Sequence, residues 1–204
     1  MSSFLYKKIW HGISIHTRKC IPEKILMFVF QMLGSFFIGG KLMTKNATSI
    51  YKYLDDEKIN YQIVMHPPVY TAEQADKYVQ KYQFARTKNL FLKNKAGYYL
   101  VTILENKRLD MKKLKENLLT SRFSFAHPEE LITKLGITSG AVSPFNLFND
   151  KQHEVTFIID ADIFKNEELI GCHPNDNTAT VILEIKDLLQ IIKQNGNPVK
   201  VVQL

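Results

Sequence analysis

The sequence lacks most of the patterns that mark extracellular proteins and the familiar enzyme classes. Its 204 residues include only two cysteines, Cys20 and Cys172, which form no CxxC pair and no zinc-ligand spacing. A disulfide scaffold and a zinc knuckle are therefore not indicated, and a reducing cytoplasm fits this cysteine usage. GxSxG, P-loop, HExxH and GxGxxG motifs are also missing. No metal or organic cofactor is indicated, so function must be inferred from unusually placed polar residues.

No apolar run reaches the roughly 20 residues that a membrane-spanning helix needs. The stretch at 25–40 is broken by two polar residues and follows a basic lead. Three interpretations stay open: a weak membrane anchor, an amphipathic helix packed on the domain, or a start codon assigned upstream of the true start at Met43. We favour the last two, because the sequence after Met43 has the pattern of a complete domain. We therefore expect an N-terminal extension over 1–45 and one domain over 46–204.

Positive charge is concentrated in two parts of the chain. The formal net charge is +7, and +6 of it belongs to residues 1–45. Within the nearly neutral remainder, residues 77–122 hold twelve Lys or Arg side chains but only three Asp or Glu. This composition predicts a local basic surface whose natural partner is phosphate. On charge alone, a solvated lysine-rich face is an equally good interpretation.

From Ser49 onward, helical and strand-like patterns alternate. Capping residues and apolar spacing predict helices over 49–59, 71–82, 110–118, 128–136 and 186–196. Alternation and turn residues predict strands over 61–66, 87–94, 98–105, 154–160, 168–173 and 178–185. The intervening stretch TSGAVSPFN is expected to be a loop. Several consecutive strands favour a mixed α/β domain, with a largely antiparallel or mixed sheet and helices packed against it.

The first place where chemistry could occur is Lys88 and Asn89, at the start of a predicted strand. Alternation puts Lys88 on one face with two leucines, and puts Asn89 on the opposite face with Lys93. A lysine beside apolar neighbours lies either at the mouth of a pocket or with its ammonium extended into solvent. Both interpretations stay open for Lys88.

The second place is a loop of small residues between a glycine and a proline. It comprises Gly140, Ala141, Val142, Ser143 and Pro144. Such a loop lets a ligand approach the backbone closely, and its amide groups could bind a carbonyl or carboxylate oxygen. An ordinary connection after a helix is the alternative.

The third place is a histidine at the end of a predicted strand. His173 is held by a following proline and precedes a turn that contains Asn177 and Thr178. This position suits a hydrogen-bonding or acid-base group, although a structural histidine is the alternative. Cys172 beside His173 invites a thiol or metal interpretation, which lacks a second pair of ligands.

In their order along the chain, these places resemble the YbaK-like, prolyl-tRNA-synthetase-associated editing domain. The resemblance covers about residues 49–197. It rests on four ordered motifs: HPPVYT, TKNLFLK followed by YYLV, LG with GxxxPF, and HPxxNTxT. The TKNLF and GAVSPF forms look most similar to the free-standing deacylases of alanyl-tRNA(Pro). One departure is Asn175-Asp176, which replaces what is more often an apolar pair.

The resemblance implies hydrolysis of the ester that joins a wrong amino acid to the terminal adenosine of proline tRNA. Alanine is the leading substrate, with serine and cysteine as rivals. The family's key lysine corresponds to Lys88, which would stabilise the ester or its adjoining phosphate. The loop from Gly140 to Pro144 would limit amino-acid size, while Asn89, His173 and Asn177, with Thr178 beside them, would hold the amino group and ribose. The vicinal ribose hydroxyl would help to activate water.

The partners implied are tRNA(Pro) charged with a small amino acid and, as a further candidate, prolyl-tRNA synthetase, but not DNA. The basic segment 77–122 would meet acceptor-stem phosphates, mostly without reading bases. The alternatives are a non-catalytic module of the same fold that binds aminoacyl-tRNA or a synthetase, and a membrane-tethered form that uses residues 25–40.

Overall fold

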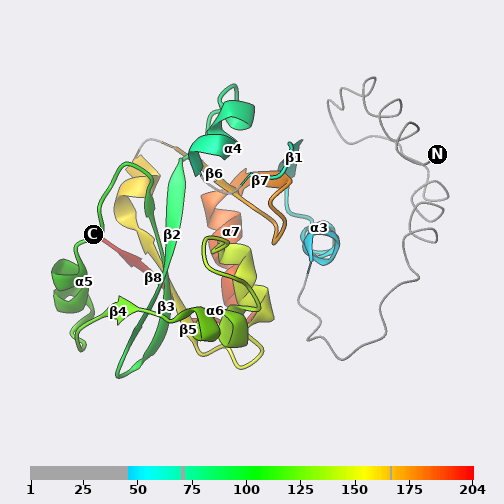
Figure 1. Cartoon of the computed structure of the whole chain (residues 1–204). Coiled ribbons are helices and arrows are strands. Elements are labelled where there is room, and N and C mark those ends of the chain that lie inside the picture. The colour runs from blue at the N-terminus through cyan, green and yellow to red at the C-terminus, as the bar shows by residue number, and fades with distance from the viewer. Residues whose placement is uncertain (1–45, 70–71, 166) are drawn as a thin grey trace, which may run out of the picture. The chain divides into compact units, whose positions relative to one another are not determined.

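The structure is a computed structural model that describes residues 46–69, 72–165 and 167–204 (Figure 1). The predicted N-terminal extension, its apolar stretch at 25–40 and the predicted helix start at Thr71 lie outside these residues. The division of the chain at residue 45 therefore stays a prediction. Across the described ranges, no helix is both long enough and apolar enough to cross a membrane.

The strands form two sheets that meet side by side. The small sheet is antiparallel and has the order β1-β7-β6, with β1 (Tyr61–Met65), β6 (Leu169–Cys172) and β7 (Ala179–Glu184). The large sheet has the order β4-β2-β3-β5-β8, with β2 (Thr87–Asn94), β3 (Gly97–Leu104), β4 (Ser124–Phe125), β5 (Val155–Asp160) and β8 (Val199–Val202). Its β3-β5 and β5-β8 pairs are parallel and the others antiparallel. The prediction of a mixed α/β fold is confirmed.

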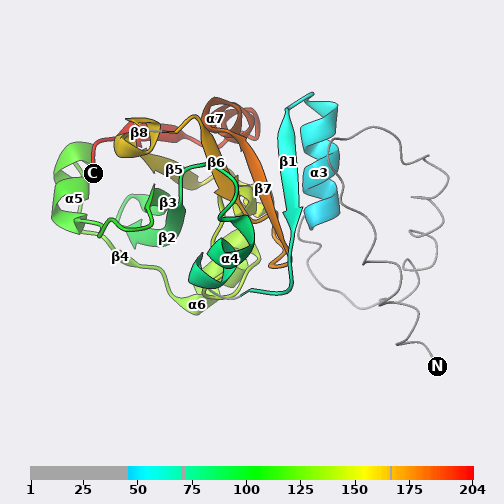
Figure 2. The same ribbon diagram turned by 90° about the horizontal axis from the view of Figure 1, so that it is seen from above.

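Helices surround both sheets. They are α3 (Ala47–Asp56), α4 (Ala72–Val79), α5 (Met111–Leu118), α6 (Pro128–Leu135) and α7 (Ile185–Gln194), with 3-10 helices η1 (Pro144–Asn149) and η2 (Ala161–Lys165). In Figure 2, α3 lies along β1 and α5 lies at the opposite end of the domain. The predicted loop TSGAVSPFN is wrong from Pro144 onward, where η1 begins. Ser143 caps η1 with its side chain, and the proline occupies the first turn.

The large sheet separates two apolar clusters. Phe91 of β2 belongs to the cluster that α6, α7 and η1 help to form, whereas Leu92 belongs to the cluster under α5. Leu90 packs against the α5 cluster as well. The predicted alternation along β2 is therefore confirmed, and Lys88 shares the face of Leu90 and Leu92 that α5 covers.

The two sheets are joined where the chain enters β2. Ala85 forms a parallel bridge with Ile170 of β6, and its backbone amide donates to the Leu169 carbonyl at 2.8 Å. The ring of Phe84 packs so tightly against Gly171 that a Cβ added there would lie 2.3 Å from a ring carbon. Residues 84–89 therefore pass directly from the small sheet to the large one.

Glu130 of α6 ties β2 and β3 to the helix. Its carboxylate accepts hydrogen bonds from Lys93 Nζ at 2.8 and 2.9 Å, from Tyr98 Oη at 2.8 Å and from the His127 amide at 2.7 Å. The hydrogen bond from Lys93, followed by that from the His127 backbone, lowers the pKa of Glu130 from 4.5 to about 2. Lys93 is thus engaged on the face of β2 opposite Lys88.

Because the pKa of Glu130 is lower in the folded state, its contribution to stability is complete above pH 4.5 and is lost as the pH falls toward 2. We expect the unfolding free energy of Glu130→Gln not to show this fall at low pH. The fall in the parent amounts to only about 1 kcal/mol, because solvent screens the partly exposed ion pair. Urea unfolding at pH 7 and pH 3 measures it. The exposed neighbour Glu129, changed to glutamine, is the control and should behave as the parent. Equal losses for the parent and Glu130→Gln would contradict the assignment.

Candidate functional site

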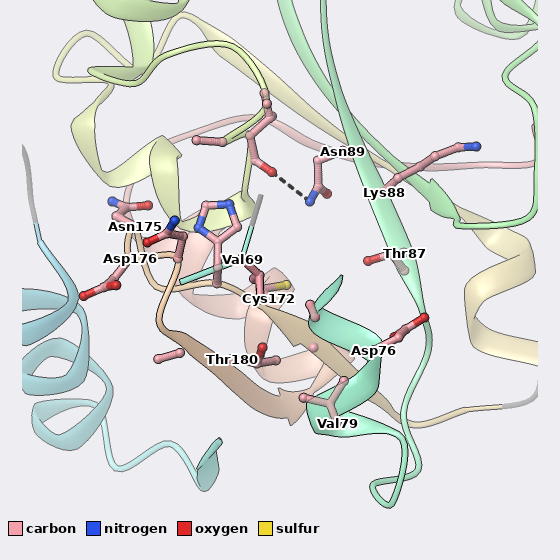
Figure 3. A pocket seen from close by; sticks show the side chains of 18 of the residues that line it. Val69, Asp76, Val79, Thr87, Lys88, Asn89, Cys172, Asn175, Asp176 and Thr180 are labelled. Atoms are coloured by element: carbon pink, nitrogen blue, oxygen red, sulfur yellow. Dashed lines mark hydrogen bonds between the residues drawn. The ribbon is translucent and has the colours of Figure 1, made fainter. Parts of the chain in front are cut away.

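A cavity of about 740 Å³ opens beside the start of β2, between the two sheets (Figure 3). Seven of the ten residues predicted from the sequence line it: Lys88, Asn89, Gly140, Ala141, Val142, His173 and Asn177. Ser143, Pro144 and Thr178 do not line the cavity. The fold thus brings together three segments that are far apart in the chain, and adds His66 and Val69 from the HPPV motif.

Asn89 fastens the small-residue loop to the large sheet. Its Nδ2 donates to the Val142 carbonyl at 3.1 Å, and its Oδ1 accepts from Thr102 Oγ1 at 2.7 Å on the neighbouring strand. Figure 3 shows the amide of Asn89 directed at this loop. Asn89 therefore sets the position of the cavity wall, a role that the sequence did not indicate.

His173 is held from the other side of the same loop. Its ring donates a hydrogen bond to the Val142 backbone, while burial, the larger effect, lowers the pKa of the ring below its ordinary value. The imidazole is therefore neutral at pH 7 and can act as a hydrogen-bonding group without a net charge. Its Nδ1 is buried and hydrogen-bonded to no group within the described ranges, so the ring keeps an unused hydrogen-bonding atom beside the cavity.

Ser143 and Asn146 lock the loop from beneath. Ser143 Oγ donates to the His173 carbonyl at 2.7 Å, and the Ser143 amide donates to Asn146 Oδ1 at 2.5 Å. Asn146, fully buried in η1, also donates through Nδ2 to Asn175 Oδ1 at 2.6 Å. Ser143 thus supports the wall from behind, and Pro144 starts η1. Their predicted contact with substrate does not match this placement.

Sequence reasoning missed Asn146 and the part played by Asn175. Asn175 adopts a left-handed backbone conformation, with φ of 60°, which asparagine tolerates better than most residues. The spacing of Ser143 and Asn146 in SPFN is a capping-box pattern, and this was the available signal for a structured segment at the end of the loop. The departure from an apolar pair at Asn175-Asp176 therefore serves a hydrogen-bonded junction between two cavity walls.

The turn after His173 binds the HPPV segment. Asp176 accepts hydrogen bonds from the Thr178 amide at 2.8 Å and from Thr178 Oγ1 at 2.6 Å, so Thr178 closes the turn. The Thr178 carbonyl accepts from the His66 amide at 2.9 Å, and the Asn177 carbonyl accepts from the Val69 amide at 3.0 Å. Two of the sequence motifs are therefore joined by backbone hydrogen bonds, which leaves the Asn177 side chain at the cavity.

Lys88 lies at the rim and extends away from Asn89 on the other side of β2 (Figure 3). Its side chain is partly exposed and forms no hydrogen bond or ion pair with the residues that the structure describes. An uncompensated ammonium at the entrance suits an anion near the cavity better than a reacting atom deep inside it. Of the two roles expected for Lys88, the geometry favours the adjoining phosphate.

Arg86 and Thr87 also line the cavity and were not predicted. The guanidinium of Arg86 lies 3.8 Å from the centre of the Phe84 ring, and its Nε is 3.3 Å from Asp76 Oδ1. Its Nη2 donates to the Val79 carbonyl at 3.0 Å. These contacts hold α4 against the entrance of β2 and give the cavity a rigid polar floor.

Among the described residues, the cavity offers no activated thiol. Burial raises the pKa of the Cys172 thiol to about 12, so the thiolate is not populated at neutral pH and the thiol interpretation is not supported. Within the described part of the chain, no three His, Cys, Asp or Glu side chains gather as metal ligands. What the site offers is a rigid wall of backbone and amide groups, a neutral imidazole and a cation at the rim. This arrangement can hold a polar ester next to an anion.

Comparisons with known proteins agree with the motifs. Residues 66–191 match the family described as "Aminoacyl-tRNA editing domain". The chain is 39% identical over 153 residues to the prolyl-tRNA editing protein ProX of Acetoanaerobium sticklandii. This alignment covers 74% of this chain and 93% of the ProX protein. It is 33% identical over 144 residues to a prolyl-tRNA synthetase associated domain-containing protein of Bos taurus, and the alignment covers 68% of this chain and 84% of that protein.

A solved structure shares the fold. It belongs to a protein described as a candidate trans-editing enzyme for prolyl-tRNA synthetase, and it superimposes with a TM-score of 0.61 at 20% identity. The alignment covers 79% of this chain and 99% of that one. At this identity the likeness concerns the fold alone.

Proposed function

Because the chain belongs to the aminoacyl-tRNA editing domain family, we propose that it hydrolyses the ester of tRNA(Pro) charged with the wrong amino acid, with alanine as the leading substrate. The observation that carries the proposal is the meeting of the four motifs around one cavity that offers ester-binding groups. The ProX relative bears the name of the same activity. Editing of tRNA charged with serine or cysteine is the alternative within this class.

In the proposed reaction, the oxygen of a water molecule bonds to the ester carbonyl carbon. The bond from that carbon to the ribose oxygen breaks, and the ribose oxygen takes a proton, giving free amino acid and tRNA. The vicinal ribose hydroxyl assists the water, and amide groups of the loop from Gly140 to Val142 face the carbonyl oxygen. His173 and Asn177 hold the ribose and amino group, and Lys88 binds the phosphate next to the terminal nucleoside.

Amino-acid selection on this proposal is steric. A synthetic site shaped for proline cannot strongly reject smaller alanine, since each missing methylene contributes only about 1–3 kcal/mol of discrimination. A second site with a fixed wall can accept alanine and exclude proline by overlap. The wall formed by Gly140, Ala141 and Val142, fastened by Asn89 and His173, supplies such a limit.

The test is a panel of tRNA(Pro) charged with alanine, serine, cysteine or proline, incubated with the purified chain. Alanine should be released fastest and proline should remain attached. Binding of every charged tRNA without release of any amino acid would overturn the proposal and favour a non-catalytic binding module. The same proposal implies action in the cytoplasm, where tRNA is charged, with prolyl-tRNA synthetase as a candidate partner.

A further inference from the structure

We propose that the outward side of α5 binds the phosphate backbone of the tRNA acceptor stem, so that the terminal nucleotide enters the cavity past Lys88. The residues are Lys112, Lys113 and Lys115 of α5 and Arg108 just before it, here called the α5 basic face. This inference rests on the proposed function and specifies where the rest of the substrate lies. It also restricts the expected phosphate-binding surface from the whole basic segment 77–122 to one helix and the residue just before it.

Several cations of that segment are already engaged within the protein. Arg86 lies against Asp76, Lys93 pairs with Glu130 at 2.8 Å, and Lys107 reaches Asp160 and Asp162 at 2.6 Å each. Asp160 is fully buried, and a buried carboxylate that lost its cationic partner would destabilise the fold. Lys107 is therefore not available to an external phosphate. These three side chains serve the fold.

The side chains of the α5 basic face, in contrast, are not held in ion pairs by the described residues. All four side chains are exposed. Asp110 is occupied as the helix cap and accepts from the Lys112 and Lys113 amides at 2.9 and 3.0 Å. Glu116 is the remaining acid of the helix, and the four cations outnumber it. The face therefore has a net positive charge, which fits a polyanion.

The orientation of α5 follows from its contacts. Leu114 is buried in the α5 cluster, with Met111 and Leu118 beside it. On one flank, Asn117 Nδ2 donates to the Gln203 carbonyl at 2.7 Å, just beyond β8. At 100° per residue, Lys112 and Lys115 lie on the opposite flank, whereas Lys113 lies on the flank of Asn117. The flank of Lys112 and Lys115 is turned away from β8, toward the side of the sheet that carries β2.

Lys88 connects this flank to the cavity. It lies on the face of β2 that α5 covers, because Leu90 and Leu92 of the same face pack in the α5 cluster. It also lines the rim of the cavity. The unpaired cations of α5 and Lys88 therefore belong to the same face of the large sheet. Figure 2 shows α3, which carries Asp55 and Asp56, at the opposite end of the domain, so the charge distribution favours one approach for an RNA.

The test compares two triple variants with the same change in net charge. One reverses α5 (Lys112→Glu, Lys113→Glu, Lys115→Glu), and the control reverses three exposed lysines elsewhere (Lys58→Glu, Lys151→Glu, Lys193→Glu). The probe is an uncharged acceptor-stem hairpin with a CCA end, titrated by fluorescence anisotropy at several salt concentrations. Circular dichroism melts establish that both variants fold.

We expect the α5 variant to bind at least tenfold more weakly at 0.1 M salt. The slope of log K against log salt should fall by about two, since Lys112 and Lys115 lie on the flank toward β2 and each lysine-phosphate contact contributes about one. The control should stay within threefold of the parent. Hydrolysis of alanyl-tRNA should fall with the α5 variant, whereas hydrolysis of 3′-alanyl-adenosine should not.

Equal weakening by both triple variants, or a parallel loss on 3′-alanyl-adenosine, would overturn the inference. If the parent hydrolyses neither substrate, the proposed deacylase function fails instead. The hairpin titration then still decides whether α5 is the RNA-binding face.

Discussion

Lys88→Met is expected to lower kcat/KM for alanyl-tRNA(Pro) hydrolysis by about 10²–10³-fold, the usual effect of removing one electrostatic contact that positions and stabilises a reacting group. The ammonium of Lys88 lies at the rim of the cavity without an acidic partner, so its removal leaves the phosphate beside the ester unheld. Methionine keeps the apolar stem against its neighbours on β2. Single-turnover release of labelled alanine measures the effect.

Two controls separate the role of Lys88 from general charge. Lys95→Met removes an exposed lysine in the β2-β3 turn and should leave the rate within about twofold, as is usual for surface substitutions. Lys88→Arg keeps the charge and should recover part of the activity. A Lys88→Met variant that works as fast as the parent, with the parent itself active, would show that the site assignment is wrong.

Asn146→Asp is expected to slow hydrolysis by about 10²-fold at pH 7 although Asn146 does not line the cavity. Its amide joins Ser143 at 2.5 Å to Asn175 at 2.6 Å. A buried carboxylate would face the Asn175 oxygen without a proton to donate, and displacement of the loop by about 1 Å is enough for such a loss. The unfolding free energy should also fall by about 1–3 kcal/mol.

The pH dependence distinguishes positioning from simple loss of folding. As the pH falls from 7 to 5, the introduced carboxyl gains a proton and regains a donor for Asn175, so the rate relative to the parent should rise. Asn149→Asp is the matched control, because Asn149 lies in the same 3-10 helix and donates to the Leu135 carbonyl at 2.9 Å. An equal slowing by both substitutions, or a pH-independent ratio, would contradict the role of Asn146.

Local patterns predicted the elements because their causes are local. The alternation along β2 places Phe91 and Leu92 in different apolar clusters, as the sequence indicated. Strands β4 and β8 were missed because both are short edge strands, whose pairing with β2 and β5 depends on residues about 30 to 40 positions away. The two-sheet arrangement likewise depends on the pairing of β1 with β7, between segments that are more than 100 residues apart.

The sequence predicted which residues meet at the cavity better than which partners they contact there. Motif order placed Lys88, Asn89 and His173 at one cavity, and the structure brings them there. What these side chains do depends on partners remote in sequence. Asn89 holds Val142, which is 53 residues away, and Asn146 holds Asn175, which is 29 residues away. Such contacts have no local signature, so Ser143 was expected to meet substrate when it supports the wall.

The bridge between Ala85 and Ile170 fixes how rigidly the two sheets that border the cavity are held together. One wall belongs to the small sheet and the other to the large sheet, and this bridge, with the Phe84 ring pressed against Gly171, sets the angle between them. To exclude the ring of proline while accepting alanine, the width of the cavity must be held to a fraction of an ångström. Close-packed regions resist such deformation, and the contact of Phe84 with Gly171 is one of them. If the chain excludes proline by overlap, as proposed, we expect its selectivity to depend on the stiffness of this joint. A looser joint would then widen the range of accepted amino acids before it slowed the reaction.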